Sequence, residues 1–116
     1  MIGLNALHGA LAVGFGAFAA HGAGVEATAL FQTGAQYQAM AGLGGALAAG
    51  FGARRAGLIL FFGAAVFAGA LYALGFGAPR GFGAVAPLGG VLMLAGWLDF
   101  AWTGLRGRLG AGNGSL

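Results

Sequence analysis

The chain is poor in charge and contains neither cysteine nor lysine. Charged residues make up 6% of its 116 residues, whereas a soluble domain carries about 25%. The lack of cysteine excludes a disulfide framework and a thiolate metal site. The scarcity of charge excludes an ordinary soluble domain, so the composition predicts a membrane protein.

A continuous apolar run from residue 57 to residue 78 reads GLILFFGAAVFAGALYALGFGA. As a helix it would be about 33 Å long, close to the ~30 Å hydrocarbon core of a bilayer. Arg54 and Arg55 precede it and Arg80 follows it. We expect a transmembrane helix here, because the rest of the chain is too small to bury such a helix in a soluble core.

Three further runs have the length and composition of spans, at residues 2–20, 30–52 and 85–105. The first resembles a signal peptide at its AFAA segment but lacks the basic region that precedes a signal sequence. Residues 106–116 have the composition of a linker. The predicted fold is therefore a single all-α domain with four transmembrane helices in a bundle.

The arginines predict the orientation of these spans. With four spans both termini lie on one side, together with Arg54, Arg55, Arg106 and Arg108, while Arg80 lies opposite. Because cytoplasmic loops carry the excess of basic residues, we expect both termini in the cytoplasm.

Glycine is abundant, at 27 residues, and small residues recur every four positions in three of the four runs. In lipid, small residues let helix backbones approach closely. We expect such packing at Gly14, Gly42, Gly50, Gly69, Gly77 and Gly89.

Four segments occur in an order that resembles a known family: GFGAFAAHG (14–22), LFQTGAQYQAMAGL (30–43), AVFAGALY (65–72) and APLGGVLMLAGW (86–97). They are similar to the motifs of the family called domain of unknown function 423, which includes bacterial YgdD-like proteins and eukaryotic relatives of transmembrane protein 256. The resemblance implies a four-helix protein of the bacterial inner membrane and no established reaction.

The chain departs from the family pattern where the family has polar groups. Gln32 replaces a glutamate, Met40 and Ala41 replace a Tyr-His pair, Ala68 replaces a serine and Ala86 replaces a threonine. This loss of polar groups favours a packing role over a chemical one.

One candidate polar cluster consists of Asn5, His8 and Asp99, which the topology places toward the cytoplasmic half. A carboxylate inside the membrane needs a partner, and a His–Asp pair could relay protons. The alternative, which we favour, is a structural one in which Asp99 pairs with Thr103 or with an arginine near the interface.

A second candidate cluster lies on the outer side and consists of His21, Glu26, Gln32, Thr33, Gln36 and Tyr37. His21 and Glu26 could bind a metal, although two ligands without a third are weak evidence, and we expect no metal site. A quinone or a lipid head group could also accept hydrogen bonds here. We favour helix capping and loop anchoring.

No nucleophile triad, phosphate loop or metalloprotease motif is present in the sequence, so we expect no catalytic residues and no enzyme. The leading hypothesis is a non-catalytic accessory or scaffold subunit that packs against itself or in a larger membrane complex. Its partners would be lipids and membrane subunits, not nucleic acid, and no cofactor is expected beyond a bound lipid or quinone. A small transporter or channel is the alternative, but the first run lacks the glutamate that four-helix exporters use.

Overall fold

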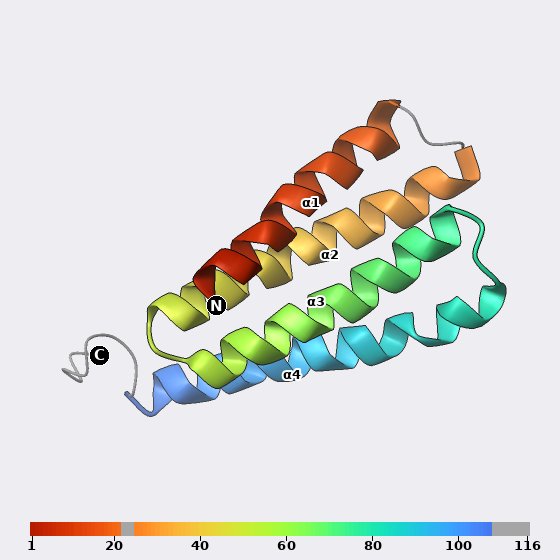
Figure 1. Cartoon of the computed structure of the whole chain (residues 1–116). Coiled ribbons are helices and arrows are strands. Elements are labelled where there is room, and N and C mark those ends of the chain that lie inside the picture. The colour runs from red at the N-terminus through yellow and green to blue at the C-terminus, as the bar shows by residue number, and fades with distance from the viewer. Residues whose placement is uncertain (22–24, 108–116) are drawn as a thin grey trace.

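A computed structural model of the protein describes residues 1–21 and 25–107, with side chains described for 1–21 and 27–107. The described residues form α1 (Ile2–His21), α2 (Val25–Gly50), α3 (Arg54–Gly75) and α4 (Ala86–Leu105), with a short 3-10 helix, η1 (Arg80–Ala84), before α4. The four α-helices run alternately up and down beside one another (Figure 1). The start of α1, the α2–α3 turn and the end of α4 therefore lie at the same end of the molecule.

Three of these helical segments are long and apolar enough to cross a membrane: α1, α3, and the segment 80–105 that joins η1 to α4. The prediction of membrane-length helices is confirmed for these three. The polar residues in the first half of α2 lower its hydropathy, so that α2 is not among them. Its 26 residues nevertheless give a rod of about 39 Å, enough to cross the hydrocarbon core.

Glycines in the left-handed region set the ends of α2 and α3. Gly52 has φ +89° and Gly77 has φ +99°. After each, the next residue's backbone N–H returns to a carbonyl five residues earlier, from Ala53 to Ala48 at 2.7 Å and from Ala78 to Ala73 at 2.9 Å. This is the Schellman arrangement, which favours glycine because it has no Cβ.

The helix ends differ from the predicted spans. α2 begins at Val25, five residues before the predicted start at residue 30. α3 is shifted toward the N-terminus relative to the predicted 57–78, so that it includes Arg54 and Arg55 and ends at Gly75. Gly77 lies in the turn after α3, and its prediction as a helix-packing glycine was wrong.

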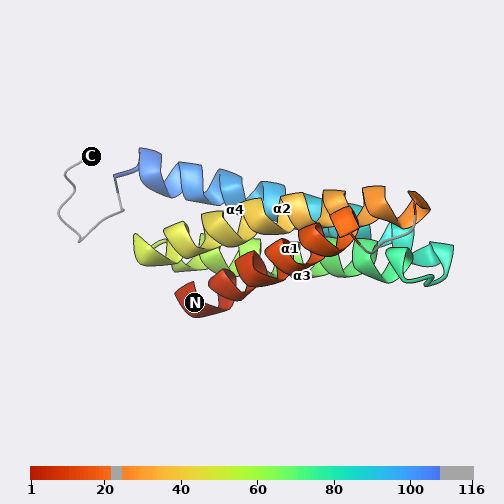
Figure 2. The ribbon, with the colours of Figure 1, turned by 90° about the horizontal axis from the view of Figure 1, so that it is seen from above.

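The helices form an open layer in which each packs against its neighbours in the sequence. α2 contacts both α1 and α3, and α3 also contacts α4, whereas α1 and α4 share no contact among the described residues. Seen from above, α1 and α4 lie on opposite sides of α2 and α3 (Figure 2). The predicted bundle is therefore not closed.

Close contacts at glycine hold the middle of the layer together. A Cβ added at Gly63 would lie 2.7 Å from the backbone nitrogen of Met93, and one at Gly96 would lie 2.7 Å from Cγ of Leu60. A Cβ at Gly89 would collide with the backbone of Phe67. Because these neighbours include backbone atoms, α3 and α4 can approach this closely only where a side chain is missing.

Of the other glycines predicted to pack, Gly42 does so, since its added Cβ would lie 2.8 Å from the Cβ of His8. Gly50 is near only the end of Ile2, at 3.8 Å, and Gly14 and Gly69 have nothing within 4 Å. Gly14 and Gly69 therefore do not pack within the chain, and their packing against another chain stays a prediction. A four-residue repeat identifies a row of small residues but does not identify the face that meets another helix.

Candidate functional site

A chain of hydrogen bonds joins α1, α2 and α3 at a buried site. Gln38 donates from Nε2 to Nδ1 of His8 at 2.8 Å, and Nε2 of His8 lies 3.0 Å from the carbonyl oxygen of Phe61. Tyr72 donates its hydroxyl to Oε1 of Gln38 at 2.6 Å. His8, Gln38 and Tyr72 are each less than 9% exposed, so these bonds replace water that cannot reach the site.

The partners determine where the protons lie. The Phe61 carbonyl can only accept, so Nε2 of His8 carries a hydrogen. Nδ1 is then the acceptor of the neutral ring, which matches the Gln38 amide nitrogen facing it. The Gln38 oxygen remains for the Tyr72 hydroxyl. Every donor in the series meets an acceptor, so the side chains of His8 and Gln38 have defined orientations.

Aromatic rings cover the outer side of this network. The ring of Phe15 stacks on that of Tyr72 with centroids 3.9 Å apart. Phe31 is almost fully buried, and its ring lies 5.8 Å from the Tyr72 ring. Phe76 packs edge-on against Phe31 at 5.0 Å. These side chains separate the polar network from the α1–α2 end of the molecule.

Asn5 lies one turn before His8 and is fully buried. Its Nδ2 donates to the carbonyl oxygen of Met1 at 3.2 Å and to that of Gly57 at 3.4 Å. Its Oδ1 has no hydrogen-bond partner among the described residues and packs directly on Gly45. Contact of a carbonyl oxygen with a glycine Cα is a weak interaction that recurs at tight helix crossings. Asn5 therefore contributes a helix contact and leaves no room for a ligand.

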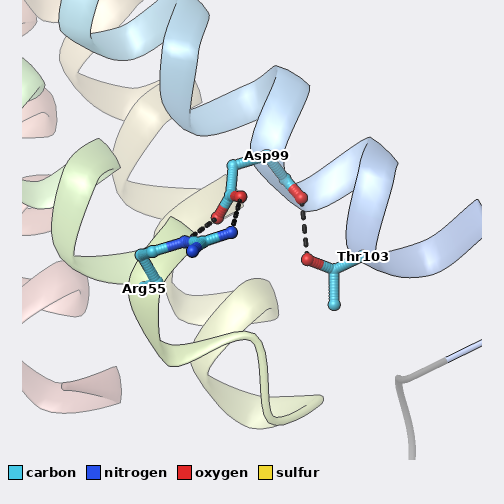
Figure 3. A network of polar contacts seen from close by, with 3 residues as sticks. All are labelled: Arg55, Asp99 and Thr103. Carbon is cyan, nitrogen blue, oxygen red and sulfur yellow. Dashed lines mark hydrogen bonds and ion pairs between the residues drawn. The ribbon is translucent and has the colours of Figure 1, made fainter. Parts of the chain in front are cut away.

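The structure separates Asp99 from Asn5 and His8, because α1 and α4 do not meet in the described part of the chain. Asp99 instead forms a two-pronged ion pair with Arg55, at 3.2 Å from Nε and 2.5 Å from Nη2 (Figure 3). The hydroxyl of Thr103 donates to the backbone oxygen of Asp99 at 2.8 Å rather than to its carboxylate. The alternative of a His–Asp relay is thus contradicted, and the favoured pairing of Asp99 with an arginine is confirmed.

The outer cluster divides between two faces of α2. Gln32 and Gln36 lie on the side of α1, at a shallow groove with Val13. Thr33 and Tyr37 lie on the side of α4. The division follows from the helix, because neighbouring residues point about 100° apart.

The two ionisable members of that cluster add no site. His21 is exposed at the end of α1, and the side chain of Glu26 lies outside the described residues. In the portion of the chain for which the structure gives side chains, no three histidine, aspartate or glutamate residues come together as metal ligands would.

A groove of about 550 Å³ lies between α2 and α4, with Phe67 of α3 among its lining residues. Tyr37 packs edge-on against Phe67, and Gly90 faces the same ring. At the other end the indole of Trp97 sits on Gly44, so that α2 and α4 close together there. The groove is therefore blind at its inner end, and Thr33 and Tyr37 supply hydroxyls toward its outer end.

The predicted clusters left out Gln38 and Tyr72, which complete the buried network. Their signal was present in the sequence, since both lie in segments that carry the family resemblance, LFQTGAQYQAMAGL and AVFAGALY. Composition alone could not distinguish Gln38 from the neighbouring Gln32 and Gln36. Only the packing of α2 against α1 and α3 shows which of the three is buried.

The fold and this site define a small, all-helical membrane protein whose buried polar groups join helices to one another. The chain belongs to the family of proteins of unknown function called DUF423, whose model matches residues 15–90. The resemblance predicted from the four motifs is thereby confirmed. No curated protein and no solved structure matches the chain.

Proposed function

We propose that the protein is a non-catalytic accessory or scaffold subunit of the bacterial inner membrane. The observation that carries this proposal is the mutual satisfaction of His8, Gln38 and Tyr72. An active site presents polar groups to a substrate, whereas these groups use their hydrogen-bonding capacity on three helices of the same chain. The arrangement supports a structural role for the only buried histidine in the described residues.

In this proposal all four helices cross the membrane and both termini face the cytoplasm. α2 is enclosed by α1 and α3 on two sides, which supports its place in the membrane despite its polar first half. Arg54 and Arg55 begin α3 at the end of the molecule where α4 finishes and Arg106 follows. Arg80 is at the opposite end, so the excess of positive charge favours the first end as cytoplasmic.

The proposed partners are membrane subunits or further copies of this chain, with lipid around them. Ala6, Ala10 and Gly14 are exposed along α1, and Ala65 and Gly69 are exposed along α3. Without side-chain bulk, another helix can approach these rows closely. The rows do not serve packing within the chain, which supports their use between chains.

Native mass spectrometry after mild-detergent extraction of the tagged protein from its own membrane tests the proposal. We expect the chain to leave the membrane with a second subunit or a second copy. Gly14→Leu should reduce the associated fraction without unfolding the chain, because a Cβ at Gly14 meets nothing in the same molecule. Val13→Leu, at a neighbouring exposed position that already carries a large side chain, is the control. Recovery of the wild-type protein only as a monomer would contradict the proposal.

A further inference from the structure

The groove between α2 and α4 has a chemistry that goes beyond a packing role. No charged residue lines it, and its walls are almost entirely apolar. Thr33 at the outer end and Tyr37 midway along the groove carry hydroxyls that have no hydrogen-bond partner among the described residues. Long side chains on a helix lean toward its N-terminus, so the Tyr37 hydroxyl is directed toward the outer end. A hydroxyl inside a membrane tends to find an acceptor, because unpaired polar groups are costly there. The groove thus offers a long apolar wall with hydrogen-bond donors at one end.

The positions of the lining residues along the helices show which end of the groove is the outer one. A Cβ at Gly34, next to Thr33, would collide with the ring of Tyr72, which lies one turn before the end of α3. Thr33 is therefore near the end of the layer where α1 joins α2. From Thr33 to Ala41 the groove follows α2 for eight residues, or about 12 Å. It ends deeper in the layer, where Trp97 meets Gly44.

The polar groups of the groove distinguish a phospholipid from a helix of a second copy. The backbone of a membrane helix is already hydrogen-bonded within itself, so an apolar helix would leave the hydroxyls of Thr33 and Tyr37 without an acceptor. A phospholipid carries ester carbonyls beside its hydrocarbon chains. The groove holds about 550 Å³. The volume lies within the ~300–1,000 Å³ range of small-molecule sites, and a single flexible chain can follow the wall to its closed end.

We propose that this groove binds one membrane phospholipid, with an acyl chain along Phe67, Met93 and Leu94 and an ester carbonyl that accepts a hydrogen bond from Tyr37. The uncharged lining matches an acyl chain, and the two hydroxyls lie at the end that points toward the head-group region. Tyr37 makes the polar contact because its ring is already positioned by Phe67, with centroids 5.3 Å apart.

The test uses the full chain in liposomes of phosphatidylethanolamine and phosphatidylglycerol doped with a phosphatidylethanolamine that carries a diazirine in its acyl chain. After illumination, mass spectrometry of peptides locates the crosslinks, and native mass spectrometry counts the phospholipids retained after detergent exchange. We expect crosslinks at Met93 and Leu94 and one retained phospholipid. Labelling spread evenly over the exposed faces of α1 and α4 would overturn the proposal.

Two variants make the test specific. Gly90→Leu places a side chain in the groove without backbone collision, since an added Cβ would lie 3.9 Å from Phe67, and it should abolish the retained lipid. Gly3→Leu is the matched control on α1, where nothing lies within 4 Å of an added Cβ, and it should retain the lipid as the wild type does. Equal retention by both variants would overturn the proposal.

Tyr37→Phe removes the hydroxyl and keeps the ring, so that it remains informative if Gly90→Leu does not fold. We expect about a fivefold weaker retention, the typical weight of one hydrogen bond. Unchanged retention, or a retained mass that corresponds to a quinone instead of a phospholipid, would contradict the assignment of the ester carbonyl to Tyr37.

Discussion

The amide nitrogen of Gln38 lies 2.8 Å from Nδ1 of His8 and donates to it across the α1–α2 contact. This bond, with the Phe61 carbonyl on the other side of the ring, makes His8 a neutral imidazole with its hydrogen on Nε2. The same amide accepts from Tyr72. One glutamine thus connects the first and third helices through the second.

The first prediction concerns the protonated nitrogen of His8. In ¹⁵N-labelled protein in micelles at neutral pH, Nε2 of His8 should resonate as a protonated ring nitrogen and Nδ1 as an unprotonated one. The reason is that the Phe61 carbonyl cannot donate a hydrogen. In Gln38→Leu the Nδ1 signal should shift, because its donor is removed. The opposite tautomer in the wild type would show that the Gln38 amide is oriented the other way.

The second prediction compares the two tyrosines. Tyr72→Phe should destabilise the protein by about 0.6 kcal/mol and at most ~1.7 kcal/mol, the range measured for hydrogen bonds between membrane helices. The Phe15 stack on the ring is retained in this variant. Tyr37→Phe should leave stability unchanged in lipid-free micelles, since its hydroxyl has no partner among the described residues. Unfolding in mixed micelles with increasing sodium dodecyl sulfate measures both, and equal effects would contradict the network.

The third prediction uses one substitution at two glycines. Gly89→Ala should destabilise the protein by about 1–3 kcal/mol, because the new methyl group collides with the backbone of Phe67 and forces α3 and α4 apart. Gly69→Ala should be neutral or stabilising by up to ~1 kcal/mol, since it enters open space and alanine favours the helix. The midpoint of thermal unfolding, followed by circular dichroism, should therefore fall in Gly89→Ala. In Gly69→Ala it should stay the same or rise.

The fourth prediction concerns the ion pair between Arg55, at the start of α3, and Asp99 of α4. The Arg55 side chain is 75% exposed and that of Asp99 only 15%, so salt should screen their attraction. Arg55→Gln and Asp99→Asn should each have a small effect on the unfolding midpoint at low salt and almost none at high salt. The double variant should be no less stable than Asp99→Asn. A large loss of partner association in Asp99→Asn alone would revive a functional role for this carboxylate.

The fifth prediction is the orientation in the membrane. Because the chain has no cysteine, Arg55→Cys and Arg80→Cys each create a single labelling site. In intact bacterial cells a membrane-impermeant maleimide should label the cysteine at position 80 and should label the one at position 55 only after the cells are opened. The reverse pattern would place both termini outside the cytoplasm.

The sequence was sufficient to predict the helical class and three membrane-length helices. A long apolar run without charge, such as that before Pro79, is typical of a membrane-spanning helix. It was less informative for α2, where the polar turn from Gln32 to Gln38 resembles a wet or interfacial segment. The structure shows Gln38 buried and Gln32 exposed. Two residues of the same type can differ in this way because burial depends on the rotation of α2 against its neighbours, which composition does not encode.

The candidate site was predicted only in part, because the packing of the helices decides which residues meet. Asn5 and His8 lie one turn apart on α1, so their proximity follows from local helix geometry. Asp99 was assigned to the same cluster only because it lies at a similar predicted depth in the membrane. Similar depth does not bring two helices side by side. The true partner of His8 is thirty positions away on α2, and only the order in which the helices pack could have selected it.

The open edge between α1 and α4 has a consequence for biosynthesis. Every donor and acceptor of the His8 network lies before the end of α3, and α4 contacts chiefly α3. As the chain enters the bilayer, the first three helices can therefore reach their final hydrogen bonds without the fourth. The last helix adds to a surface whose polar groups are already paired, so its arrival requires no rearrangement of the His8 network.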